Sequence, residues 1–106
     1  MITVEVFRKS DNYAGFEVSG HAGYAESGSD IICAAVSVLT VNTVNSIEIL
    51  AKDRVIDQER EGFLSCRFPD GLSAEGRLLM ESMILGLEQI ETNYTEPYIK
   101  VIFSEV

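Results

Sequence analysis

The feature that most constrains the fold is the segment from Ile31 to Ala51, because it is apolar on almost every side of a helix. Its aliphatic residues include Ile31, Ile32, Ala34, Ala35, Val38, Leu39, Val41, Val44, Ile47, Ile49 and Leu50. Many of them are β-branched, which lowers intrinsic helix propensity, so tertiary packing must hold this helix in place. A helix of this kind is covered on more than one side. We expect a sheet on one side and a neighbouring helix or a second subunit on another.

Segments typical of β-strands lie before and after this helix. Residues 2–7 and 14–20 alternate apolar and polar side chains around a polar turn, which predicts a first β-hairpin. Residues 54–58 and 63–68 predict a second hairpin around a charged segment that contains glycine, and residues 97–106 predict a final strand.

A second helix is predicted between the second hairpin and the last strand. Ser73 is a suitable N-cap, and the helix is expected to end near Asn93. Apolar residues at helical spacing predict a core-facing stripe of Leu79, Met83, Leu87 and Ile90. The element order is therefore ββαββαβ. It predicts a single α+β domain over residues 1–106, with two layers, in which a mostly antiparallel sheet is covered by two helices.

The chain is strongly acidic, since 17 Asp and Glu residues against 8 Lys and Arg residues give a formal net charge of −9 at pH 7. This charge repels phosphate backbones and anionic lipids, so we expect no direct binding to nucleic acid or to membranes. The same charge attracts basic peptides and proteins. A role in solubility alone is the more common explanation for such a charge.

The N-terminal residues MITVEVFRKS lack the pattern of a signal peptide. We also expect no segment that approaches the roughly 18 apolar residues of a membrane span. These features favour a cytoplasmic protein, in which Cys33 and Cys66 are free thiols rather than a disulfide.

The residues most suggestive of chemistry lie in residues 20–37, GHAGYAESGSDIICAAVS, which hold the only histidine and one of the two cysteines. Small residues without periodicity predict a loop from His21 to Ser29, and Asp30 can cap the helix that follows. Cys33 would then be the third helical residue, beside free N–H groups and the positive end of the helix dipole, which favours thiolate over thiol. His21 can take the thiol proton and return it to a leaving amine. The segment therefore predicts a cysteine nucleophile with a histidine base.

Four small residues around this pair have supporting roles in the prediction. Gly20 and Gly23 flank the histidine and let a substrate backbone approach closely. Gly28 and Ser29 lie at the predicted helix start, where main-chain N–H groups can bind the oxyanion that forms on a carbonyl under attack.

Asp30 and Ser37 are the remaining polar candidates. Asp30 can orient the imidazole as well as cap the helix, and a cap alone explains it equally well. Ser37, one turn after Cys33, can donate a hydrogen bond into the site. A serine within a helix, however, most often bonds the carbonyl four residues back.

Structural explanations and other chemistries compete with this prediction. Cys33 is explained equally well as a small buried hydrophobic residue, and His21 can simply bond a main-chain carbonyl. Cys66, within a strand, is better explained as structural. A zinc site is disfavoured because there is no Cys-x-x-Cys pair, and we expect no cofactor because no phosphate-binding glycine loop is present. A redox sensor would need Cys66 or a partner thiol near Cys33. A non-catalytic acidic module that binds a basic protein stays an alternative.

The pair Gly20-His21, followed by a short variable loop and then by the segment 30–37, DIICAAVS, resembles the ribosomal-processing cysteine protease family, often called Prp. The resemblance covers essentially the whole chain. It implies a homodimeric bacterial cysteine endopeptidase that removes the N-terminal extension of a large-subunit ribosomal protein. By position, Cys33 corresponds to the nucleophile and His21 to the base.

Gly20, Asp30 and Ser37 correspond to other motif positions of the family, and Ile32 stands where valine is more familiar. The resemblance agrees with two features noted above. A strongly acidic enzyme suits a basic ribosomal protein precursor as substrate, and an apolar first helix suits a homodimer with helices at its interface. The family's cleavage site is rich in phenylalanine, which implies an apolar groove beside the loop, although the sequence does not identify the residues that line it.

Overall fold

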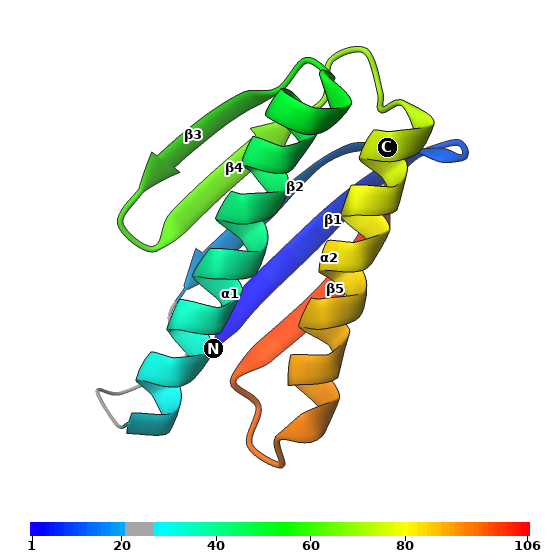
Figure 1. The fold of residues 1–106 in the computed structure, drawn as a ribbon. Coiled ribbons are helices and arrows are strands. Elements are labelled where there is room, and N and C mark those ends of the chain that lie inside the picture. Colours follow the sequence, from blue (N-terminus) through cyan, green and yellow to red (C-terminus); the bar gives the residue numbers. More distant parts are fainter. Residues whose placement is uncertain (21–26) are drawn as a thin grey trace.

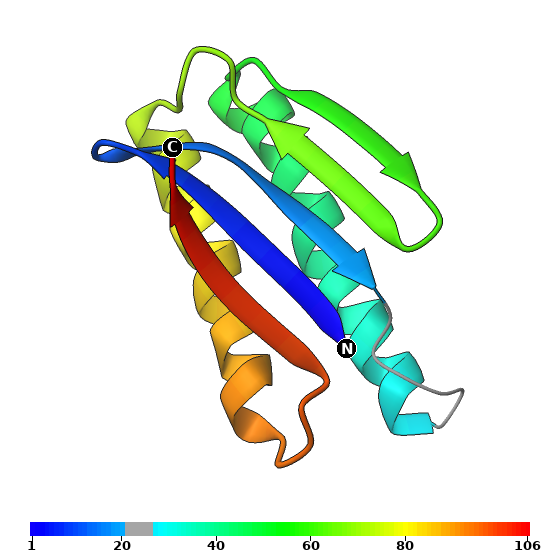
Figure 2. The same ribbon diagram turned by 180° about the vertical axis from the view of Figure 1, so that it is seen from behind.

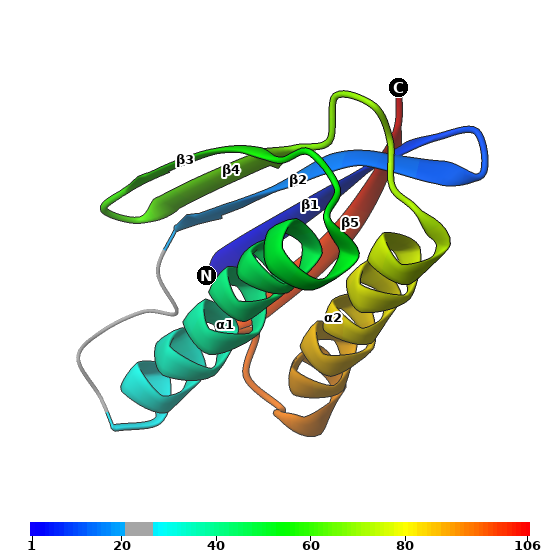
Figure 3. The same ribbon diagram turned by 45° about the horizontal axis from the view of Figure 1, so that its top comes forward.

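The computed structural model describes the main chain of residues 1–20 and 27–106 and the side chains of residues 1–20 and 31–106. It has two layers, a five-stranded sheet and a pair of long helices that lie on one face of this sheet (Figures 1 and 3). In chain order the elements are β1 (Ile2–Lys9), β2 (Asn12–Gly20), α1 (Ser27–Ser46) with a π-helical continuation (Ile47–Ala51), β3 (Ile56–Arg60), β4 (Phe63–Arg67), α2 (Ala74–Asn93) and β5 (Ile99–Glu105). The predicted order ββαββαβ and the α+β class are confirmed.

The sheet has the strand order β3-β4-β2-β1-β5. Neighbouring strands are antiparallel except β5, which runs parallel to β1, so the prediction of a mostly antiparallel sheet is confirmed. Alternate residues of β1 (Ile2, Val4 and Val6) are buried, and so is Phe16 of β2. Figure 2 shows that no helix of the described residues covers the opposite face. The hydrophobic core therefore lies between the sheet and the two helices.

The apolar helix α1 lies on the sheet and beside α2 (Figure 3). Ile32, Val36 and Val44 are buried, and the buried Thr40 hydroxyl donates a hydrogen bond of 2.8 Å to the Val36 carbonyl. The predicted cover by a sheet and a neighbouring helix is therefore confirmed. Part of this segment is nevertheless uncovered in the single chain, since its exposed large apolar side chains are Ile31, Val38, Val41, Ile49 and Leu50.

The segment Ile31–Ala51 also corrects one expectation. It is 21 residues long with a mean hydropathy of 1.5, which by length and composition alone is enough to cross a membrane. The expectation that no segment has these properties was wrong. Its apolar character on one side is explained by packing, because Ile32, Val36, Val44 and Ile47 belong to the core.

The second helix begins as predicted. The Ser73 hydroxyl accepts a hydrogen bond of 3.1 Å from the Gly76 N–H and donates one of 2.8 Å to the Asp53 carboxylate. The buried side chains of α2 are Met80, Met83, Ile84 and Leu87. The predicted core-facing stripe is confirmed, since Met83 and Leu87 are buried and Leu79 and Ile90 are half-buried and pack against the core. Met80 and Ile84 extend this core-facing side beyond the predicted stripe.

The predicted strand ends shift by a few residues, because pairing with neighbouring strands decides where a strand ends. The second hairpin turns at Glu61 and Gly62, whereas the whole segment 59–62 was predicted as its turn. Gly62 has a φ of 73°, a left-handed conformation that favours glycine. The last strand begins at Ile99 rather than at residue 97.

Candidate active site

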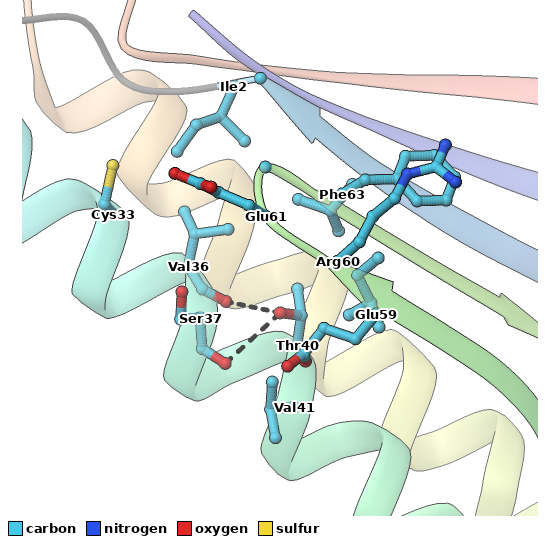
Figure 4. Close-up of a pocket in the computed structure, with 14 residues that line it drawn as sticks. Ile2, Cys33, Val36, Ser37, Thr40, Val41, Glu59, Arg60, Glu61 and Phe63 are labelled. Atoms are coloured by element: carbon cyan, nitrogen blue, oxygen red, sulfur yellow. Dashed lines mark hydrogen bonds between the residues drawn. The ribbon is translucent and has the colours of Figure 1, made fainter.

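Cys33 lies on α1, is half-buried, and lines a cleft between α1 and the β3–β4 hairpin (Figure 4). The cleft has a volume of about 520 Å³. Its lining residues come from the ends of β1 and β2, from one side of α1 and from the hairpin: Ile2, Val18, Gly20, Cys33, Val36, Ser37, Thr40, Val41, Glu59, Arg60, Glu61, Gly62, Phe63 and Leu64. A cleft of this size is in the range of protein ligand sites, so part of a peptide fits beside the thiol.

The cleft combines a largely apolar floor with a charged rim. Ile2, Val36 and Leu64 are buried core residues that reach it from the sheet and from α1. On the hairpin, the guanidinium carbon of Arg60 lies 4.5 Å from the centroid of the Phe63 ring, a cation–π contact. Such a surface suits an extended peptide with apolar side chains.

The structure brings three of the predicted site residues to this cleft, namely Gly20, Cys33 and Ser37. Gly20 ends β2 with a φ of 90°, and a Cβ there would collide with the main-chain carbonyl of Met1. The fold therefore requires glycine at this position, and the role of Gly20 in substrate approach stays a prediction. The exposed Ser37 hydroxyl makes no hydrogen bond with another described residue, so the bond within the helix that is usual for serine is not found.

For five other predicted site residues the structure describes no side chain. His21 and Gly23 lie outside the described residues. Gly28, Ser29 and Asp30 lie within α1, where only their main chain is described. The catalytic and substrate-binding roles predicted for these five residues stay predictions.

The start of α1 differs from the prediction. The helix begins at Ser27, so residues 27–29 are helical rather than part of a loop, and Asp30 is not the N-cap. Helix propagation adds one main-chain hydrogen bond per residue, so a helix that is fixed by the packing of its later turns extends through small residues of modest propensity. Cys33 consequently lies in the second turn instead of the first. Because the effect of the helix dipole falls off within the first turn, the predicted source of thiolate stabilisation is weakened.

The second thiol, Cys66, lies in the core on β4 and is 1% exposed. Burial is the main cause that raises its pKa to about 12, and the carboxylates of Asp57 and Glu48 contribute smaller parts of this increase. Asp57 is its partner residue on β3. The Cys66 thiol is therefore protonated and inaccessible, which agrees with a structural role and disfavours a redox pair with Cys33.

Sequence reasoning did not assign the β3–β4 hairpin to the site. The charged residues 59–62 are typical of an exposed turn, and no motif in them indicates a catalytic or binding role. The hairpin reaches Cys33 only because β4 pairs with β2, which places it over the side of α1 that carries the thiol. A strand pattern alone does not give this pairing.

Comparison with known proteins shows which family the chain belongs to. The chain matches the family model described as Cysteine protease Prp over residues 1–100. The ribosomal processing cysteine protease Prp of Bacillus subtilis (strain 168) is 37% identical over 103 residues, which cover 91% of this chain and 92% of that protein. The protein of the same name from Staphylococcus aureus (strain Mu50) is 30% identical over 99 residues, which cover 91% and 93%.

Solved structures agree with this similarity. A crystal structure from Streptococcus mutans has a TM-score of 0.84 at 31% identity and covers 100% of this chain and 96% of that one. The ribosomal processing protease Prp of S. aureus, in complex with a covalently linked product peptide, has a TM-score of 0.86 at 29% identity over 98% and 100%. The same S. aureus protease has also been solved in complex with a substrate peptide. This chain belongs to the Prp family of ribosomal processing cysteine proteases, and it is an enzyme.

Proposed function

We propose that this enzyme is an endopeptidase that removes the N-terminal extension of a large-subunit ribosomal protein precursor. In this proposal Cys33 is the nucleophile and His21 is the base, and no cofactor takes part. The enzyme acts in the cytoplasm and binds neither nucleic acid nor membranes directly. The precursor is a basic protein, and the net charge of −9 favours its approach.

The observation that carries the proposal is the position of Cys33 in the cleft between α1 and the β3–β4 hairpin. Of the two thiols, only Cys33 is accessible to a peptide, because Cys66 is buried and protonated. Relatives in the same family have been solved with a substrate peptide and with a covalently linked product peptide. We therefore assign the cleft as the peptide groove.

In the proposed reaction the Cys33 thiol and the His21 imidazole act on the carbonyl of the peptide bond that is cut. His21 takes the proton of Cys33, and the sulfur forms a bond to the scissile carbonyl carbon. The carbon–nitrogen bond then breaks, the imidazolium gives its proton to the leaving amine, and a thioester remains on Cys33. Water, deprotonated by the same imidazole, hydrolyses the thioester and restores the free thiol.

Activation of the thiol is assigned to His21 rather than to the start of α1. Cys33 lies in the second turn, where the helix dipole contributes little. Ser37, one turn further along, lines the same cleft with a hydroxyl that is free among the described residues, so it can donate a hydrogen bond to the substrate or to the oxyanion. In this proposal the Asp30 carboxylate orients the His21 imidazole, a role that does not require Asp30 to be the N-cap.

We also propose that the enzyme is a homodimer. Val38 of α1 is 67% exposed, and Leu78 and Leu85 of α2 are 67% and 59% exposed. These side chains lie on the two helices that form one layer of the fold (Figure 1). A second copy that packs helices against helices would remove this apolar surface from water.

The proposal is tested with a purified ribosomal protein precursor that carries its N-terminal extension. Wild type, Cys33→Ala and His21→Ala are incubated with it, and the intact mass is measured. Release of the extension at a single bond by wild type alone supports both catalytic assignments. If wild type binds the precursor without cutting it and Cys33→Ala binds equally well, the chain is an acidic binding module or assembly factor for this protein instead.

A further inference from the structure

Two glutamates of the β3–β4 hairpin, Glu59 and Glu61, line the same cleft as Cys33. Both side chains are exposed, and neither makes a hydrogen bond or an ion pair with another described residue. Arg60 lies between them in sequence but is engaged over the Phe63 ring, 4.5 Å from its centroid. Neither carboxylate therefore has an ion-pair partner among the described residues, and the one cation that lines the cleft among them, Arg60, lies over Phe63.

The two carboxylates lie at different points along the cleft. In Figure 4 Glu61 extends toward Cys33, whereas Glu59 lies at the end formed by Thr40 and Val41. At about 1.5 Å per helical residue, Cys33 and Thr40 are separated by about 10 Å along α1. An extended peptide covers this distance with about three residues. A peptide in the cleft thus meets one carboxylate beside the reacting thiol and another about three residues away.

The wall around Glu61 favours a long basic side chain. Ile2 and Val36 lie next to it and are buried, apolar residues. Lysine and arginine place their aliphatic stems on apolar surface and their charged ends at a polar rim. A nearby low-dielectric wall also strengthens the attraction between opposite charges. An acidic side chain at the same position of the peptide would be repelled.

We propose that Glu61 determines specificity by selecting a lysine or arginine within one or two residues of the bond that is cut, and that Glu59 adds a weaker preference about three residues away. This inference rests on the proposed function, because it assigns the peptide groove to the cleft that holds Cys33. Here two glutamates recognise the charge of individual substrate side chains, an effect separate from the general attraction of a basic protein by the net charge.

The test uses short fluorogenic peptides that share one apolar cleavage segment. Lys, Gln or Glu is placed in turn at each position from three before to three after the cleaved bond. Wild type, Glu61→Gln and Glu61→Lys are compared, with Glu81→Gln as the control, since Glu81 is an exposed residue of α2 that lies outside the cleft. Glu61→Gln and Glu81→Gln change the net charge equally, so only a local effect separates them.

Wild type is expected to prefer Lys over Gln at one position next to the cleaved bond, by about tenfold in kcat/KM, as for a charge-assisted hydrogen bond. Glu61→Gln is expected to abolish this ratio, Glu61→Lys to reverse the preference toward Glu, and Glu81→Gln to keep it. The inference is overturned if wild type cleaves the Lys and Gln peptides equally, or if Glu81→Gln lowers the ratio as much as Glu61→Gln does.

A binding measurement separates this inference from the proposed function. Anisotropy of labelled peptides is measured with Cys33→Ala and with Cys33→Ala/Glu61→Gln. Binding that prefers Lys only when Glu61 is present supports the specificity role even if wild type cuts no peptide, in which case the protease assignment alone fails. Cleavage by wild type without any charge preference in rate or binding overturns the specificity role and leaves the protease assignment intact.

Discussion

The buried thiol of Cys66 predicts a specific loss of stability at high pH. Its ordinary pKa of 9.0 is raised to about 12 in the folded protein, first by burial and then by Asp57 and Glu48. Between these two values the unfolded chain releases a proton that the folded chain keeps. The unfolded state therefore binds fewer protons, and the free energy of unfolding falls as pH rises above 9. At pH 10 the loss is about 1 kcal/mol, from the 1.36 kcal/mol that corresponds to one pKa unit.

The assay compares two variants in reducing buffer, Cys33→Ala and Cys33→Ala/Cys66→Ala, so that only the Cys66 thiol differs. Urea unfolding is followed by circular dichroism at pH 8 and pH 10. The variant that keeps Cys66 is expected to lose about 1 kcal/mol more than the double variant between these pH values. The packing loss caused by Cys66→Ala is the same at both pH values and cancels in this difference. An equal loss in both variants would refute the conclusion that burial keeps this thiol protonated.

Three further predictions follow from the packing. At an exposed helix position, replacing glycine by alanine raises the free energy of unfolding by about 1 kcal/mol. Gly76→Ala is instead expected to lower it by about 2 kcal/mol in urea titrations, because the new Cβ collides with the Asp53 carboxylate that binds the N-cap Ser73. Val38→Glu is expected to shift the proposed homodimer to monomer in sedimentation velocity, while Asn45→Glu, at another exposed position of α1, is expected to do so less. Gly20→Ala is expected to lower the free energy of unfolding by about 1–3 kcal/mol, as measured by thermal unfolding. Alanine is strained at the positive φ of this position, and its Cβ would collide with the main-chain carbonyl of Met1.

The order of elements was predictable because each element carries its own local pattern. The alternation of Ile2, Val4 and Val6 gives a strand whichever strands are its neighbours, and Ser73 is a cap because its hydroxyl serves the N–H of a residue three positions later. The start of α1 was not predictable from local signals. Asp30 has the chemistry of a cap, but packing of the later turns extends the helix back to Ser27.

The candidate nucleophile was predictable and its surroundings were not. Cys33 stands out because a single cysteine follows the only histidine across a segment of small residues. Glu61 and Phe63 reach the same cleft through the pairing of β4 with β2, a contact between distant parts of the chain. Such contacts depend on the whole topology, so a pattern of neighbouring residues does not reveal them.

The two walls of the cleft differ in how freely their residues can change. On one wall Cys33 is fixed by α1, whose neighbouring residues Ile32 and Val36 are 1% and 3% exposed and belong to the core. The other wall includes the end of β3, which is exposed at every residue and lies at the edge of the sheet. Surface substitutions usually change stability by about 0.5 kcal/mol or less, whereas core substitutions cost several times more. Changes at Glu59 or Glu61 can therefore alter what the groove selects while the thiol stays in position.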